Sequence, residues 1–220
     1  VVQFHYNFGS YPDILCYFLL LLTFINKERT NAPYIFFFLA LLTKETAIFT
    51  ALFFLAIKNI SKIKIILSCS FYLPIYLFLN TGTYDLNHYL VPLQSDIMHW
   101  FNQSKPYLFT GYFSSIKFLW IIIILYILRD FRNSYPIILL IIGISLQFMF
   151  GGDTTRFVSF MFLGLIFVVE KLKMNKFLFL NIFILFLNII TVKYYVFAYG
   201  EMIILNESRI SFLNFFEIFK

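Results

Sequence analysis

Apolar runs recur along almost the whole chain and are separated by short polar loops. The clearest runs cover about residues 12–26, 65–80, 113–128, 135–150, 157–170 and 177–199. A membrane-spanning helix needs about 20 mainly apolar residues, which several of these runs approach. Hydrophobic residues make up 61% of the chain and charged residues only 13%, too little polar surface for a soluble domain. The sequence therefore predicts an all-α, polytopic transmembrane helical bundle.

The apolar run from Ala32 to Ile57 admits two interpretations. It is either one span with Lys44 and Glu45 in its middle, or two short helices that meet at this pair. The second interpretation places the basic loops "NKERTN", "KNISKIK", "RDFRN" and "KLKMNK" on one face of the membrane. Positive-inside counting therefore favours a short hairpin at 32–57, with the basic loops cytoplasmic and Lys44 toward the exterior. We expect about eight membrane-crossing helices in all.

The two halves of this hairpin are too short to cross a membrane alone. Each has about 12 residues, or roughly 18 Å of helix, against a hydrocarbon core of about 30 Å. The turn should therefore lie below the outer surface. Irregular backbone at that depth is tolerated only against protein or a water-filled cavity. We expect "TKET" to line a cavity that opens to the exterior.

Two further segments shape the expected organisation. We predict an interfacial helix near 89–101 that lies in the membrane surface. Its apolar residues recur at helical spacing: Leu90, Leu93, Ile97, Trp100 and Phe101. Proline and glycine are few and no internal repeat is present, so we predict a single transmembrane domain over 1–220. The chain opens at Val1 without a methionine, and we expect it to be the C-terminal part of a longer protein.

Ionisable residues at membrane depth are the first candidates for function, because burying one costs about 2.5–3.5 kcal/mol on insertion scales. Lys44 can bind an anionic head group, and Glu45 can accept a proton or hydrogen-bond a sugar hydroxyl. The plainer alternative for this pair is an interfacial ion pair at a helical turn. Asp13 follows Pro12 at a helix start, where an acidic residue is stabilising without any further role.

The motif "GGDTTRF" holds the second group of candidates. Asp153, Thr154 or Thr155 can cap the next helix, which places Arg156 in that helix's first turn. An arginine there opposes the helix dipole unless it and the free backbone N–H groups face a phosphate. The alternative is ordinary capping, with Arg156 extended to the surface. No spacing typical of metal ligands is present, so no metal site is expected.

The combination of these segments resembles the polytopic GT-C superfamily, which includes the protein O-mannosyltransferases and the lipid A aminoarabinose transferases. The resemblance is carried by a "PD" that opens a span, by "LALLTKE" inside a short helical pair and by "DTTRF" before a later span. The matching residues are Asp13, Thr43, Lys44, Glu45 and Arg156. It covers about residues 6 to 57 and 151–170.

This resemblance implies a glycosyltransferase that uses a polyprenyl-phosphate-linked sugar at the exterior face and transfers the sugar to a hydroxyl of a lipid, glycan or protein. Lys44 and Arg156 would bind the donor phosphate, and no cofactor is implied. The family's usual catalytic acid lies in a first exterior loop that this chain lacks. That acid is either upstream of Val1 or is replaced by Asp13, Glu45 or Asp153.

Other functions compatible with the sequence are a transporter or lipid flippase, a lipid-linked polysaccharide polymerase or ligase, and a structural subunit of a membrane complex. The absence of repeats and the placement of the charges on one side favour chemistry at the exterior face. The net charge of +6 is explained by cytoplasmic loops and does not indicate a nucleic acid partner. The expected location is a bacterial or archaeal plasma membrane, or the endoplasmic reticulum in a eukaryote.

Overall fold

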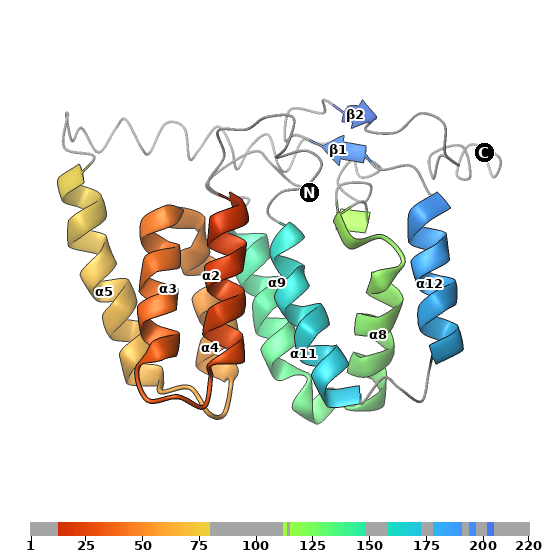
Figure 1. Cartoon of the computed structure of the whole chain (residues 1–220), viewed down its shortest axis with the longest axis horizontal. Helices are drawn as coiled ribbons and strands as arrows, with labels where there is room; N and C mark the ends of the chain where they lie inside the picture. Colours follow the sequence, from red (N-terminus) through yellow and green to blue (C-terminus); the bar gives the residue numbers. More distant parts are fainter. Residues whose placement is uncertain are drawn as a thin grey trace. The chain divides into compact units, whose positions relative to one another are not determined.

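The structure is a computed structural model that describes residues 13–79, 112–113, 115–147, 158–172, 178–190, 194–196 and 202–204. Within these residues it contains eight α-helices (Figure 1): α2 (Asp13–Ile25), α3 (Ala32–Thr43), α4 (Ala51–Ala56), α5 (Lys62–Leu79), α8 (Leu119–Arg129), α9 (Tyr135–Gln147), α11 (Phe162–Leu172) and α12 (Leu178–Ile190). Short 3-10 helices form η1 (Glu45–Thr50), η2 (Phe131–Asn133) and η3 (Ser159–Met161). The predicted helical architecture is confirmed. In the described ranges, no helix combines the length and the apolar character that crossing a membrane requires.

One predicted helix is too long at its C-terminal end. The run at 177–199 was expected to be helical throughout, but α12 ends at Ile190 and a strand, β1 (Tyr194–Val196), follows. This strand pairs in antiparallel register with β2 (Met202–Ile204). Tyrosine and valine fit a pleated strand better than a helix, because their aromatic and β-branched side chains lose rotamer freedom against a helical turn. The expected interfacial helix at 89–101 lies outside the described residues.

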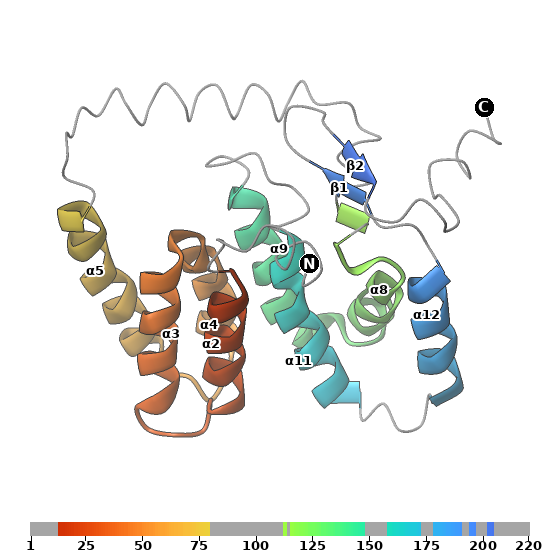
Figure 2. The same cartoon turned by 45° about the horizontal axis from the view of Figure 1, so that its top comes forward.

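The described residues fall into two compact units. The first contains α2 to α5 together with α9, and the second contains α8, α11, α12 and the strand pair. In the first unit, α2 and α3 lie side by side and run in opposite directions (Figure 1 and Figure 2). α5 packs against α3 and α4, and α9 packs against α4 and η1.

The hairpin interpretation of residues 32–57 is confirmed. α3 ends at Thr43, the backbone of Lys44 is extended, and η1 and α4 then carry the chain back. Pro33 lies in the first turn of α3, where its missing N–H costs nothing. At the other end of α3, the Thr43 hydroxyl donates to the carbonyl of Leu39 at 2.8 Å. The helix therefore begins and ends at residues whose chemistry suits those positions.

Phenylalanine side chains form the core of the first unit. Phe37, Phe53 and Phe54 are fully buried. The ring of Phe53 lies 5.3 Å from that of Phe54 and 6.0 Å from that of Phe24, and the ring of Phe54 lies 5.4 Å from that of Phe37. Each such pair contributes about 0.5–1.5 kcal/mol beyond the area it buries. These contacts join α2, α3 and α4 into one packed cluster.

The two basic loops of this unit lie at the same end, as the positive-inside argument requires. The Asn59 amide donates to the Glu28 carboxylate at 3.2 Å, which joins the loop after α4 to the loop after α2. Lys64 at the start of α5 donates to the Thr30 carbonyl at 2.9 Å. α9 begins at the same end, because the Tyr135 hydroxyl donates to the Ala56 carbonyl at 2.7 Å.

In the second unit, α8 and α11 pack together through an edge-on contact of Tyr126 with Phe167, whose ring centroids are 6.1 Å apart. α12 runs opposite to α8, because Lys117 just before α8 donates to the Asn188 carbonyl near the end of α12 at 2.8 Å. Lys117 itself has a φ of 47°, in the left-handed region that few non-glycine residues adopt.

Candidate functional site

Lys44 occupies the junction between α3 and η1. Its backbone is extended, with φ −157° and ψ 122°, so it belongs to neither helix. Its N–H donates to the Ala40 carbonyl at 3.0 Å, and its carbonyl accepts from the N–H of Ala47 at 3.1 Å. These two bonds hold the junction in one conformation. The side chain of Lys44 is 5% exposed, so the cation lies inside the packed end of the unit.

The two acidic candidates in this unit share that end. Glu45 is the first residue of η1, and its side chain is exposed. Asp13 is the first residue of α2. Because α2 and α3 are antiparallel and joined by the loop at 26–31, the start of α2 and the end of α3 lie at the same end of the unit. The predicted grouping of Asp13 with Lys44 and Glu45 at one end is therefore consistent with the helix directions.

Asp153 and Arg156 lie outside the described residues. The expected meeting of Lys44 and Arg156 at one anion therefore stays a prediction, and so does a catalytic role for Asp153.

Two further polar residues lie at this end of the unit: Thr46, the last residue of "TKET", and Gln147, which no sequence pattern indicated. Gln147 is the last residue of α9 and is 0% exposed. Its Nε2 and Oε1 atoms make no hydrogen bond, and neither does the buried Oγ1 of Thr46 in η1. Within the part of the chain that the structure describes, these are the only buried side-chain polar atoms without a partner.

The register between α9 and the returning half of the hairpin places Gln147 near Thr46. α9 is antiparallel to η1 and α4, because Tyr135 bonds Ala56 at one end and Gly143 packs on the backbone of Phe49 further along. One more turn of α9 from Gly143 reaches Gln147, and one turn back from Phe49 reaches Glu45 and Thr46. Gln147 therefore lies at the level of the junction. Lys44, Thr46 and Gln147 therefore lie at the same end of the first unit, and we call this end the junction site.

A second buried lysine, Lys117, belongs to the second unit. Lys117 is 7% exposed, and its ammonium bonds the Asn188 carbonyl in the last turn of α12. The last carbonyls of a helix lack partners within the helix and carry partial negative charge. Lys117 therefore has an evident structural role as a cap of α12, and it carries no functional assignment.

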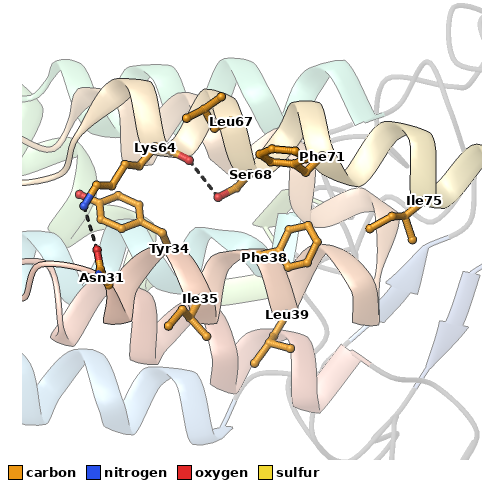
Figure 3. Close-up of a pocket in the computed structure, with 10 residues that line it drawn as sticks. All are labelled: Asn31, Tyr34, Ile35, Phe38, Leu39, Lys64, Leu67, Ser68, Phe71 and Ile75. Carbon is orange, nitrogen blue, oxygen red and sulfur yellow. Dashed lines mark hydrogen bonds between the residues drawn. The ribbon is translucent and has the colours of Figure 1, made fainter.

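An apolar groove lies between α3 and α5, with a volume of about 610 Å³ (Figure 3). One end of the groove is polar: the ammonium of Lys64 donates to Asn31 Oδ1 at 2.9 Å and lies 4.9 Å from the centroid of the Tyr34 ring. Apart from Ser68, the rest of the groove is lined by apolar side chains of both helices: Ile35, Phe38, Leu39, Leu67, Phe71 and Ile75. Leu39 lies one turn before the end of α3, so the apolar part extends toward the end of the unit that holds the junction site.

This arrangement can bind an anion and an apolar chain, and it offers no evident metal centre. Among the described residues, no group of three or more histidine, cysteine, aspartate or glutamate side chains is placed to bind a metal ion. Lys44 supplies a buried positive charge, Thr46 and Gln147 supply unpaired hydrogen-bonding groups, and the groove supplies an apolar surface.

The sequence carried only a weak signal for Gln147. It ends an apolar run of thirteen helical residues in which it is the single amide. A lone polar residue at the end of such a run is also what a solvent-facing helix end looks like. Only the packing of Gly143 on the backbone of Phe49 shows that Gln147 lies at the level of the α3–η1 junction.

Comparison with known proteins adds no further assignment. The chain matches no family model, no curated protein and no solved structure.

Proposed function

We propose that this chain is a membrane-embedded glycosyltransferase, similar to the GT-C superfamily, that uses a polyprenyl-phosphate-linked sugar as donor. The sugar passes to a hydroxyl of a lipid, a glycan or a protein at the exterior face of the membrane. The observation that carries the proposal is the buried cation at the junction of α3 and η1. Lys44 lies at a break between two short helices, at the end opposite the basic loops.

Membrane residence is supported by the surface of the helices. Every described α-helix except α4 exposes large apolar side chains, for example Ile63 at 70%, Phe71 at 65% and Leu128 at 76%. Exposed apolar surface on this scale is unfavourable in water and favourable in lipid. The basic loops after α2 and α4 lie together, which fits a cytoplasmic end of the first unit. The junction site is then at the exterior end.

The role proposed for Lys44 follows from its buried positive charge at the end of a short helix. A buried cation attracts an anion more strongly than an exposed one does, because less water screens the charge. The anion proposed here is a lipid phosphate, and Arg156 contributes a second cation from the "DTTRF" motif. Charge-assisted hydrogen bonds from both side chains would hold the donor phosphate at about 2.7–2.9 Å. The apolar groove between α3 and α5 suits part of the prenyl chain.

In the proposed reaction, the acceptor oxygen attacks the anomeric carbon of the donor sugar. The bond from that carbon to the phosphate oxygen breaks, and polyprenyl phosphate leaves with the bonding electron pair. Lys44 and Arg156 stabilise the charge that develops on the leaving phosphate. One of the carboxylates of Asp13, Glu45 or Asp153 takes the proton from the acceptor hydroxyl as general base.

The test is sugar transfer by the full chain in lipid nanodiscs, supplied with labelled polyprenyl-phosphate sugars and a hydroxyl acceptor. Lys44→Met removes the charge and keeps most of the side-chain volume. Losing one charged hydrogen bond to the phosphate should lower transfer about 10- to 100-fold. Lys58→Met is the matched control, because Lys58 is exposed in the loop at the other end of the unit. Equal transfer by wild type and Lys44→Met would refute the proposal, and so would a wild type that uses none of the donors.

A further inference from the structure

Three buried polar atoms at the junction site lack hydrogen-bond partners among the described residues: Nε2 and Oε1 of Gln147, and Oγ1 of Thr46. Both residues are at least nine-tenths buried. Each unsatisfied buried polar group destabilises the fold by about 1–3 kcal/mol, so folded proteins rarely retain such groups without a compensating interaction. Hydrogen bonds to a bound ligand are one such compensating interaction.

The backbone around these residues explains why the atoms stay unpaired. Thr50 lies about one turn further along η1. Its hydroxyl donates a hydrogen bond to the Ala47 carbonyl at 2.7 Å, so it is paired within the helix. Thr46 lacks this option because the residue three positions before it is Thr43, which lies on the far side of the extended Lys44. The Gln147 amide ends α9 and makes no bond to the helix behind it.

We propose that Gln147 and Thr46 bind neighbouring hydroxyl groups of a sugar, so that the junction site recognises the carbohydrate part of its substrate. A primary amide offers two N–H donors and one acceptor, and a threonine hydroxyl offers one donor and accepts as well. A phosphate dianion only accepts, so it leaves Gln147 Oε1 unpaired. A prenyl chain pairs with none of the three atoms. A pair of sugar hydroxyls both donates and accepts, and therefore satisfies all of them.

That the bound sugar is the one transferred in the reaction rests on the proposed function. That Gln147 and Thr46 bind sugar hydroxyl groups does not. Within the proposed function, the cation of Lys44 holds the phosphate while the neutral groups of Gln147 and Thr46 contact the sugar next to it. The two parts of the junction site are then separable by mutation: one changes phosphate affinity, and the other changes sugar affinity.

The test measures binding of soluble methyl glycosides of hexoses and 2-acetamidohexoses to the full chain in nanodiscs, by saturation-transfer NMR. At least one glycoside should bind wild type. Gln147→Leu and Thr46→Val should each weaken that binding about tenfold or more, as expected for losing one or two hydrogen bonds to a ligand. Thr50→Val is the matched control, since its hydroxyl is already paired, and it should bind as wild type does. If wild type binds no glycoside, or if both site variants bind normally, the inference is overturned.

Thermal stability separates a ligand site from a structural one. If the Gln147 amide is unpaired in the ligand-free protein, Gln147→Leu should leave Tm unchanged or raise it, because an apolar side chain of similar size replaces unsatisfied polar atoms. If an internal water bridges the amide to the protein, the same variant loses those bonds and its Tm falls by several degrees. That fall would overturn the inference.

Failure of the proposed function gives a different pattern. Lys44→Met should keep its glycoside affinity while losing transfer. If Lys44→Met keeps full transfer while Gln147→Leu still loses glycoside binding, the phosphate assignment fails and the sugar site stands. If Lys44→Met loses transfer while Gln147→Leu binds glycosides normally, the sugar site fails and the phosphate assignment stands.

Discussion

Replacing Gly143 by alanine tests the packing on which the junction site depends. A Cβ atom built at Gly143 runs into the carbonyl oxygen of Phe49, and it lies 3.2 Å from the carbonyl carbon of that residue. The obstacle is backbone in η1, which cannot rotate away as a side chain can. Leu52 Cδ1, at 3.7 Å, makes only an ordinary contact. The substitution therefore has to push α9 away from the returning half of the hairpin.

Two opposed effects set the size of the change. Alanine is a better helix former than glycine by about 0.8–1.0 kcal/mol, which favours the variant. Overpacking against a fixed backbone typically costs about 1–3 kcal/mol, and a direct clash with a carbonyl belongs at the upper end of that range. We expect a net destabilisation of about 1–2 kcal/mol. For a chain of this size, each kcal/mol lowers Tm by about 2–4 °C.

The assay is the thermal unfolding of Gly143→Ala in nanodiscs, with Ile142→Ala as the control on the same helix. Ile142 is exposed, so its truncation should change Tm little. Gly143→Ala should also weaken glycoside binding, because moving α9 moves Gln147. A Tm equal to or above that of wild type would mean that helix propensity outweighs the clash, and the register that places Gln147 at the junction would be wrong.

Further predictions concern the bonds that fix the helix ends. Lys117→Met should leave the Asn188 carbonyl without its charged partner and speed amide hydrogen exchange in the last turn of α12. Sugar transfer by the full chain should stay at the wild-type level. Unchanged hydrogen exchange would contradict the capping role. Tyr135→Phe should remove the bond to the Ala56 carbonyl and destabilise the first unit by about 1 kcal/mol in thermal unfolding, and an unchanged Tm would show that this bond contributes nothing to stability.

The helices could be predicted from the sequence because they depend on local pattern. The division of residues 32–57 into two helices followed from charge placement, since one unbroken span would put "NKERTN" on the wrong side. The structure confirms the break at Lys44. The end of α12 was missed because apolar periodicity does not distinguish "YYV" in a helix from the same residues in a strand. The pairing of Tyr194–Val196 with Met202–Ile204 decides it.

The junction site could be predicted only in part. Lys44 could be predicted as a candidate because a charge inside an apolar run is rare and costly. Gln147 was not, because its position depends on the pairing of α9 with a hairpin nearly a hundred residues earlier. That pairing is set by Gly143, whose missing side chain allows the backbone of Phe49 to approach closely. A close approach between distant helices leaves no periodic signal in a single sequence.

Whether Lys44 and Arg156 hold the same phosphate, as proposed above, is tested most directly by a double-mutant cycle on lipid binding. The measurement is the affinity of the full chain for polyprenyl phosphate without sugar, for wild type, Lys44→Met, Arg156→Met and the double variant. Two cations on one anion should give a coupling free energy of about 1 kcal/mol or more, because groups that share a partner do not act additively. Losses that add within about 0.5 kcal/mol, or no loss from either single variant, would contradict the account.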